Sequence, residues 1–143
     1  YIHPGSKLGV LLELNCETDF VANTDDFKNL CKDISMHIAA SLPMAVSRDE
    51  IPNSVLEREK EIYADQARQS GKPDEIIEKM IEGRLNKFFQ ESVLLEQTFV
   101  KDPDKTVNDL ITDAVAKLGE NIVISRFSRF QLGEKVTSVS SEE

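Results

Sequence analysis

The sequence has no tryptophan, only two cysteines and two histidines, and no long apolar run. So few Cys and His residues, without ligand spacing, indicate neither a zinc site nor a disulfide framework. No stretch approaches the roughly 20 apolar residues that span a bilayer, and no signal-peptide pattern opens the chain. We therefore expect no membrane association and a reducing compartment. That compartment is the cytoplasm, or an organelle stroma or matrix if a transit peptide precedes Tyr1.

Basic residues are also scarce, with 17 Lys and Arg against 26 Asp and Glu, which gives a net charge of -9. An acidic surface repels a phosphate backbone, so direct binding of nucleic acid is not expected. The rest of the composition is that of a folded protein, with 40% hydrophobic and 30% charged residues. A chain of 143 residues is long enough for one domain with its own core.

The residues that side-chain catalysis needs are not found in any recognisable arrangement. The chain has no nucleophile elbow, no glycine-rich phosphate loop and no His-rich ligand spacing. His3 lies beside a turn and His37 in a helical pattern, and neither has a partner at ligand spacing, so both are interpreted as structural or surface residues. We expect a protein that is not an enzyme and uses neither a cofactor nor a metal.

Hydrophobic periodicity and turn residues predict an α+β fold, with a three-stranded antiparallel sheet packed on helices. The strands are expected at residues 1–3, 8–14 and 121–132, the first two joined in a hairpin through Pro4 and Gly5. The last strand does not alternate strictly, which indicates burial at one end or a bulge. Helix caps are expected at Asn23 to Asp26, at Thr106 and at Gly119.

A helical hairpin is predicted over about residues 54–92. Ser54 begins a capping-box pattern, Gly71 ends the first helix and Pro73 opens the second. The second helix carries an apolar stripe of Ile76, Ile77, Met80, Ile81, Leu85 and Phe88. Two antiparallel helices of about 25 Å each would result. Their charged faces are interpreted either as solvated surfaces or as a partner contact.

Phe20 is unusual because it is a large apolar residue between Asp19 and Val21, at a strand exit where small polar residues are common. An aromatic side chain on an exposed loop can anchor a binding partner. The alternative is that Phe20 staples the incoming helix, as apolar residues before helix caps often do. Spacing alone does not decide between these interpretations.

Several motifs, in order along the chain, resemble the core domain of the translation elongation factor Ts family. They are Glu13 to Ala22 (ELNCETDFVA), Met36 to Ala40, Gln69 to Pro73, Glu82 to Leu85, Phe99 to Val107 and Gly119 to Ile122. The resemblance covers residues 1–134 and leaves residues 135–143 as a tail that is predicted to be disordered. The small domain, similar to a ubiquitin-associated module, with which the family normally begins is not in this sequence.

The resemblance implies a guanine-nucleotide exchange factor that binds elongation factor Tu, GDP-bound or nucleotide-free, and promotes GDP release. It implies that Thr18, Asp19, Phe20 and Val21 form a tip that intrudes into the GTPase. Met36 and His37 would form a secondary contact. The helical hairpin would be a protruding coiled-coil arm, and the chain would form a homodimer. The alternative is a ribosome-associated or polyprotein-derived module that keeps this fold without exchanging nucleotide.

Overall fold

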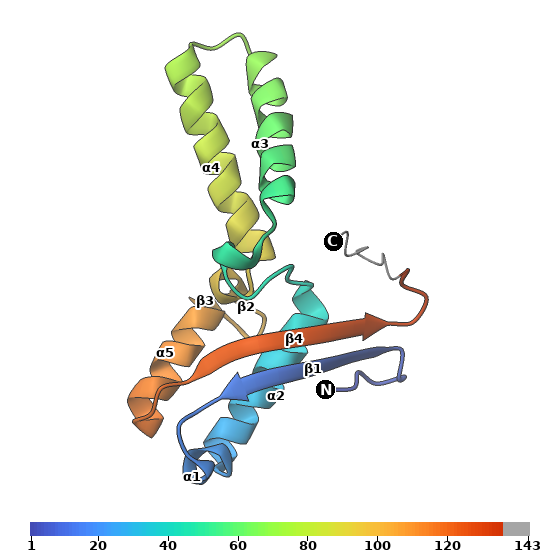
Figure 1. Ribbon diagram of the computed structural model, residues 1–143, viewed down its shortest axis with the longest axis vertical. Helices are drawn as coiled ribbons and strands as arrows, with labels where there is room; N and C mark the ends of the chain where they lie inside the picture. Colours follow the sequence, from blue (N-terminus) through green and yellow to red (C-terminus); the bar gives the residue numbers. More distant parts are fainter. Residues whose placement is uncertain (136–143) are drawn as a thin grey trace, which may run out of the picture.

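A two-stranded antiparallel sheet lies across a long helix, α2, and two further helices rise from this body as an arm (Figure 1). The computed structural model describes residues 1–135 and confirms the α+β class. The elements are β1 (Leu8–Asn15), α1 (Asp19–Ala22), α2 (Asp25–Ser41), η1 (Arg48–Glu50), α3 (Asn53–Arg68), α4 (Asp74–Ser92), η2 (Leu94–Glu96), β2 (Thr98–Phe99), β3 (Asp102–Thr106), α5 (Val107–Leu118) and β4 (Val123–Gln131).

The expected three-stranded sheet is wrong. Within residues 1–135, β1 pairs with β4 in one sheet and β2 with β3 in another, and each sheet has two strands. The predicted first strand is reduced to an isolated bridge between Ile2 and Gly9. The predicted turn is present, because Gly5 and Ser6 reverse the chain with φ angles of 95° and 56°. Backbone hydrogen bonds still join Tyr1 to Val10 in both directions, at 2.8 Å each, and His3 to Leu8 at 2.9 Å.

The irregular last strand has the predicted bulge. Glu13 of β1 pairs with Arg126 and Leu14 pairs with Ile124, so Ser125 is an extra residue in a bulge. Beyond the bulge Ile124 is buried at 6% exposure, while Phe130 near the other end is 68% exposed. The predicted bulge is therefore confirmed, whereas burial of one whole end is not, because Val123 beside Ile124 is 48% exposed.

The predicted caps of two helices are confirmed. Thr24 caps α2 by accepting a hydrogen bond from the backbone N–H of Phe27 at 3.2 Å. Thr106 and Asp109 form a reciprocal capping box at the start of α5. Gly119 ends α5 with φ 73°, a conformation that glycine adopts without steric cost. Local chemistry thus determines where these helices begin and end.

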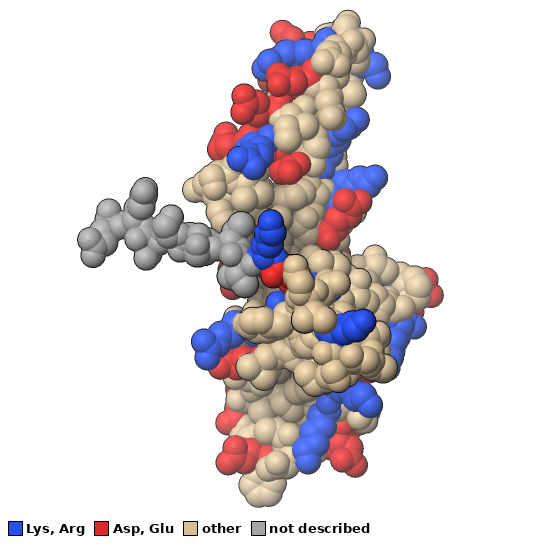
Figure 2. Space-filling model, turned by 90° about the vertical axis from the view of Figure 1, so that its right-hand side faces the viewer, with Lys and Arg blue, Asp and Glu red and all other residues tan. Residues whose placement is uncertain are grey.

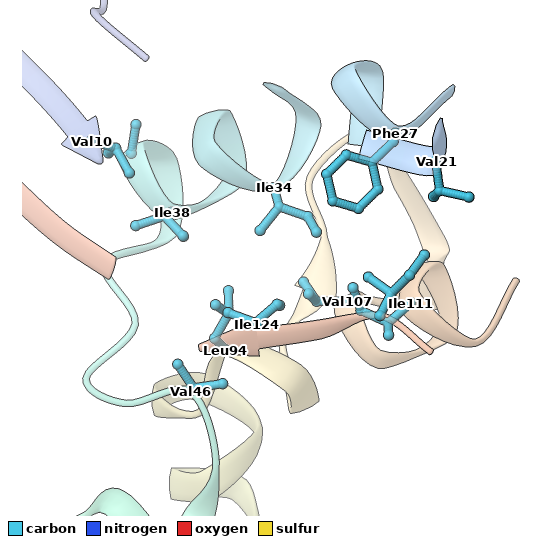
Figure 3. Close-up of a cluster of buried hydrophobic side chains, with 12 residues drawn as sticks. Val10, Val21, Phe27, Ile34, Ile38, Val46, Leu94, Val107, Ile111 and Ile124 are labelled. Atoms are coloured by element: carbon cyan, nitrogen blue, oxygen red, sulfur yellow. The ribbon is translucent and has the colours of Figure 1, made fainter. Parts of the chain in front are cut away.

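The core lies between the β1–β4 sheet, α2 and α5. Ile34 and Ile38 of α2 are at its centre, both with no exposed surface. Figure 3 shows side chains from several elements meeting there: Val10, Val21, Phe27, Ile34, Ile38, Val46, Leu94, Val107, Ile111 and Ile124. Since Val21 belongs to α1, this cluster also anchors that short helix.

Helices α3 and α4 form the predicted hairpin, which protrudes from the body (Figure 1). The capping box predicted at Ser54 is wrong, because α3 begins at Asn53 behind Pro52, whose φ of -58° already suits a helix start. The apolar stripe of α4 is half-buried except at Ile76, which is 44% exposed. Whether the helices pack as a coiled coil stays a prediction. Residues 136–143 of the predicted tail lie outside the described residues.

The base of the arm has a small core of its own. Ala45, Ile51, Phe89 and Val93 are buried there in a cluster separate from the body core. The Arg48 guanidinium lies 4.3 Å from the Phe89 ring centroid, and its Nε donates to Glu96 at 2.8 Å. Figure 2 shows charged side chains of both signs along the arm, above a broad uncharged surface on the body.

Candidate functional site

The strand exit after β1 lies at the end of the molecule opposite the arm (Figure 1). Here α1 makes a single helical turn. Thr18 precedes it in an extended conformation, with φ -134° and ψ 154°, and its hydroxyl oxygen accepts a hydrogen bond from the backbone N–H of Val21 at 3.4 Å. The predicted tip residues Thr18 to Val21 are therefore the helix cap and the first three residues of α1.

Phe20 points away from the body. Its side chain is 89% exposed, the largest value among the exposed large hydrophobic residues in the part of the chain that the structure describes. The alternative that Phe20 staples the incoming helix is therefore wrong. Val21 makes the inward contact instead, at 9% exposure, in the cluster that also holds Phe27 and Ile111 (Figure 3).

Short-range hydrogen bonds fix the backbone of the tip and join it to Thr24, the cap of α2. The Thr24 hydroxyl donates to the carbonyl oxygen of Val21 at 2.7 Å. The backbone N–H of Asn23 donates to the carbonyl oxygen of Asp19 at 3.0 Å. The Cys16 thiol donates to the Thr18 carbonyl oxygen at 3.3 Å. These bonds leave the Phe20 side chain exposed on a turn whose backbone is fixed.

Glu120 also holds the tip, and the sequence analysis missed its role. One carboxylate oxygen accepts from the backbone N–H groups of Glu17 and Thr18 at 3.1 and 3.0 Å. The other accepts from the Thr18 hydroxyl at 2.6 Å. Glu120 follows Gly119 at the end of α5, within the motif Gly119 to Ile122. That position was the available signal, but it does not indicate which segment the carboxylate contacts.

The predicted secondary contact is split between two environments. His37 has no exposed surface, so its ring cannot touch a partner in this conformation, whereas Met36 is half-buried. The His37 Nδ1 accepts from the backbone N–H of Val100 at 3.3 Å, and Nε2 lies 2.9 Å from the Gln97 side-chain oxygen. This pattern fits a neutral ring with the proton on Nε2. The structural interpretation of His37 agrees with this geometry, and the partner contact stays a prediction.

Burial lowers the pKa of His37 from its usual value of 6.5, while the hydrogen bond to Gln97 acts in the opposite direction. The neutral ring therefore links α2 to the segment that contains β2. In the region that the structure describes, no three His, Cys, Asp or Glu side chains gather as metal ligands. Among the same residues no helix has both the length and the apolar character needed to cross a bilayer.

Comparison with known proteins identifies the family. The sequence model described as Elongation factor TS matches residues 1–134. The chain belongs to the elongation factor Ts family. Among curated relatives, elongation factor Ts of Thermoanaerobacter sp. (strain X514) is 54% identical over 99% of this chain and 70% of its own length. Those of Geotalea daltonii and Heliobacterium modesticaldum are 57% and 60% identical, over 99% and 94% of this chain and 66% and 62% of theirs.

The chain therefore spans roughly two thirds of the length of these relatives. The matched region contains α1, the arm and Glu120. Membership of the family places the chain among translation elongation factors and confirms the resemblance found in the motifs.

Proposed function

We propose that this chain binds elongation factor Tu and promotes release of GDP, without chemistry of its own. The exposure of Phe20 carries this proposal, since a large apolar side chain held outward on a short, hydrogen-bonded turn gains free energy only when a partner covers it. Asp19 lies next to Phe20 and is also exposed, so the tip presents an apolar and an acidic group together. The relatives are bacterial, which supports the cytoplasm as the proposed location.

The energies at the tip are of the size that exchange requires. Burying a Phe side chain contributes about 1.5–3 kcal/mol, and a hydrogen bond to a charged Asp about 1.5–3 kcal/mol. Weakening nucleotide affinity a thousandfold needs a coupling free energy of about 4 kcal/mol. Linkage makes this coupling reciprocal, so GDP must weaken the binding of this chain by the same factor.

The test is the rate at which a fluorescent GDP analogue leaves elongation factor Tu in the presence of excess GDP. Wild-type chain is expected to accelerate release, and Phe20→Ala to lose most of this acceleration. Met44→Ala is the matched control, because Met44 is another exposed apolar residue, at 51%, outside the tip. Wild-type chain that binds the GTPase without accelerating release would favour the non-exchanging module instead.

We also propose that two copies of the chain associate through the outer face of the β1–β4 sheet. Along β1, Val10 and Leu12 face α2 and the core, so Leu11 between them faces outward, at 76% exposure. Phe130 lies opposite Gly9 on the same outer face and is 68% exposed. Ile2 and Leu132, 68% and 74% exposed, border one shallow hollow with Phe130. A twofold dimer brings the same surface of both copies into contact, so an exposed apolar face can be buried against the same face of a second copy.

A further inference from the structure

Glu120 connects the end of α5 to a loop that lies 102 positions earlier in the sequence. Its carboxylate accepts three hydrogen bonds there, two from backbone N–H groups and one from the Thr18 hydroxyl. Hydrogen bonds to an ionised acceptor are stronger than those between neutral groups. All three donors belong to Glu17 and Thr18, directly before α1.

The turn that carries Phe20 needs such a partner. An isolated helical turn is unfavourable, since ordering several residues is repaid by few hydrogen bonds. In α1 the buried Val21 and the half-buried Ala22 pack on the core, but both lie in the second half of the turn and do not restrain its start. The Glu120 carboxylate restrains that start, because it binds Glu17 and Thr18, the two residues that precede α1.

The Thr18 hydroxyl connects Glu120 to the backbone of α1. It donates its proton to Glu120 at 2.6 Å, which leaves its oxygen lone pairs available for the backbone N–H of Val21. Phe20 lies between the residue that Glu120 holds and the residue that the core holds. Fixing the backbone at Thr18 and at Val21, on either side of Asp19 and Phe20, limits the directions that the Phe20 side chain can take.

We propose that Glu120 is a positioning residue for nucleotide exchange, which orders the turn so that Phe20 is presented in one orientation before the GTPase is met. The inference rests on the proposed function and adds to it a residue outside the tip. Its physical basis is preorganisation, because a binding loop that is already ordered does not lose that conformational entropy when it binds.

The test is a double-mutant cycle on the acceleration of GDP release from elongation factor Tu. Wild type, Glu120→Ala, Phe20→Ala and the double variant are compared at a chain concentration well below saturation. Glu120→Ala is expected to lower the acceleration about tenfold, which corresponds to the net contribution of one charged hydrogen bond. Adding Glu120→Ala to Phe20→Ala is expected to change the rate less than twofold, since Glu120 then has no Phe20 to position.

Two controls separate positioning from other roles. Glu134→Ala removes the same charge at the opposite end of β4 and is expected to keep wild-type acceleration. Amide hydrogen exchange reports on the turn directly, and Glu120→Ala is expected to speed exchange at the Glu17 and Thr18 amides while the amides of α2 keep their protection. If Glu120→Ala does not fold, Glu120→Gln replaces it. This variant keeps an acceptor for both amides, and a loss of about threefold is expected.

The outcomes are distinct. If the double variant loses acceleration by the product of the two single losses, Glu120 acts independently of Phe20, by direct contact with the GTPase or through the fold. That result would overturn the inference. Unchanged acceleration in Glu120→Ala would also overturn it. Wild-type chain that does not accelerate release would overturn the proposed function itself, and with it any role of Glu120 in exchange.

Discussion

Nε2 of His37 lies 2.9 Å from the side-chain oxygen of Gln97, and neither side chain is exposed by more than 4%. Gln97 in turn donates to the carbonyl oxygen of Glu91 at 2.8 Å, near the end of α4. One buried imidazole thus joins α2 in the body to the last turn of the arm. Such a linkage is sensitive to protonation, because a second ring proton would remove the acceptor for the Val100 N–H.

Acidification below pH 6.5 is expected to lower the stability of the chain through His37. Burial lowers the pKa of His37 in the folded state, whereas the unfolded chain has the usual value of 6.5. Between these two values the unfolded state binds more protons, so the free energy of unfolding falls as the pH decreases from 6.5 toward the folded pKa. The slope is at most about 1.4 kcal/mol per pH unit.

This pH dependence is measured by urea unfolding at pH 7.5, 6.5 and 5.5. His37→Gln is expected to show a flatter dependence than wild type. His3→Gln is the matched control because His3 is exposed, and it is expected to keep the wild-type dependence. Identical pH profiles for wild type and His37→Gln would contradict the prediction.

Phe20→Ala is expected to impair GDP release with little effect on stability, whereas Val21→Ala is expected to lower stability. Removing the exposed Phe20 ring is expected to change the free energy of unfolding by less than about 0.5 kcal/mol. Truncating the buried Val21 is expected to lower it by about 2 kcal/mol, because a cavity forms beside Phe27 and Ile111. Unfolding midpoints and GDP release are measured on the same samples. A large loss of stability in Phe20→Ala would show that its ring packs on the body.

The arm is expected to loosen separately from the body when Phe89 is truncated. Phe89 is 8% exposed in the small cluster at the base of the arm, which is separate from the body core. Phe89→Ala also removes the ring on which the Arg48 guanidinium lies. We expect the free energy of unfolding to fall by about 3 kcal/mol, mainly through weaker packing of the arm.

Hydrogen exchange measures where this loss occurs. In Phe89→Ala the amides of α3 and α4 are expected to lose protection, while those of α2 keep it. Ile76→Ala on the same helix is the control, since Ile76 is 44% exposed and its truncation leaves the base intact. Equal loss of protection in α2 and α4 would mean that arm and body unfold as one unit.

Features set by neighbouring residues could be predicted from the sequence, and features that depend on distant partners could not. The caps at Thr24, Thr106 and Gly119 were predicted because each is satisfied within a few residues. The third strand was predicted wrongly, because an apolar segment beside a turn does not reveal that its pairing with β1 amounts to a single bridge, between Ile2 and Gly9. At Ser54 a local pattern failed because the preceding Pro52 had already begun the helix.

The same distinction applies to the candidate site. The sequence identified Phe20 as unusual at a strand exit, but its exposure depends on Val21 taking the inward position in a core assembled from several elements. Glu120 could not be identified as the partner of Thr18, because no local spacing relates residues 102 positions apart. The burial of His37 is likewise a tertiary effect, since its contacts come from Gln97 and Val100.

The proposed dimer is expected to break when lysine is placed on the outer face of the β1–β4 sheet. Leu11→Lys and Phe130→Lys introduce charges at positions that are 76% and 68% exposed, where a monomer tolerates them. In a dimer the same charges would be buried against the second copy without a partner, which costs several kcal/mol. Met44→Lys is the control, because Met44 is an exposed apolar residue that lies outside the β1–β4 sheet.

Sedimentation velocity at micromolar concentration measures the outcome. Wild type and Met44→Lys are expected at twice the mass of the chain, and both sheet variants at the mass of one chain with unchanged helix content by circular dichroism. A monomeric wild type would contradict the proposed dimer. A dimer that persists in Leu11→Lys and Phe130→Lys would place the interface elsewhere, because an apolar contact of this kind does not accommodate two opposed lysines on a twofold axis.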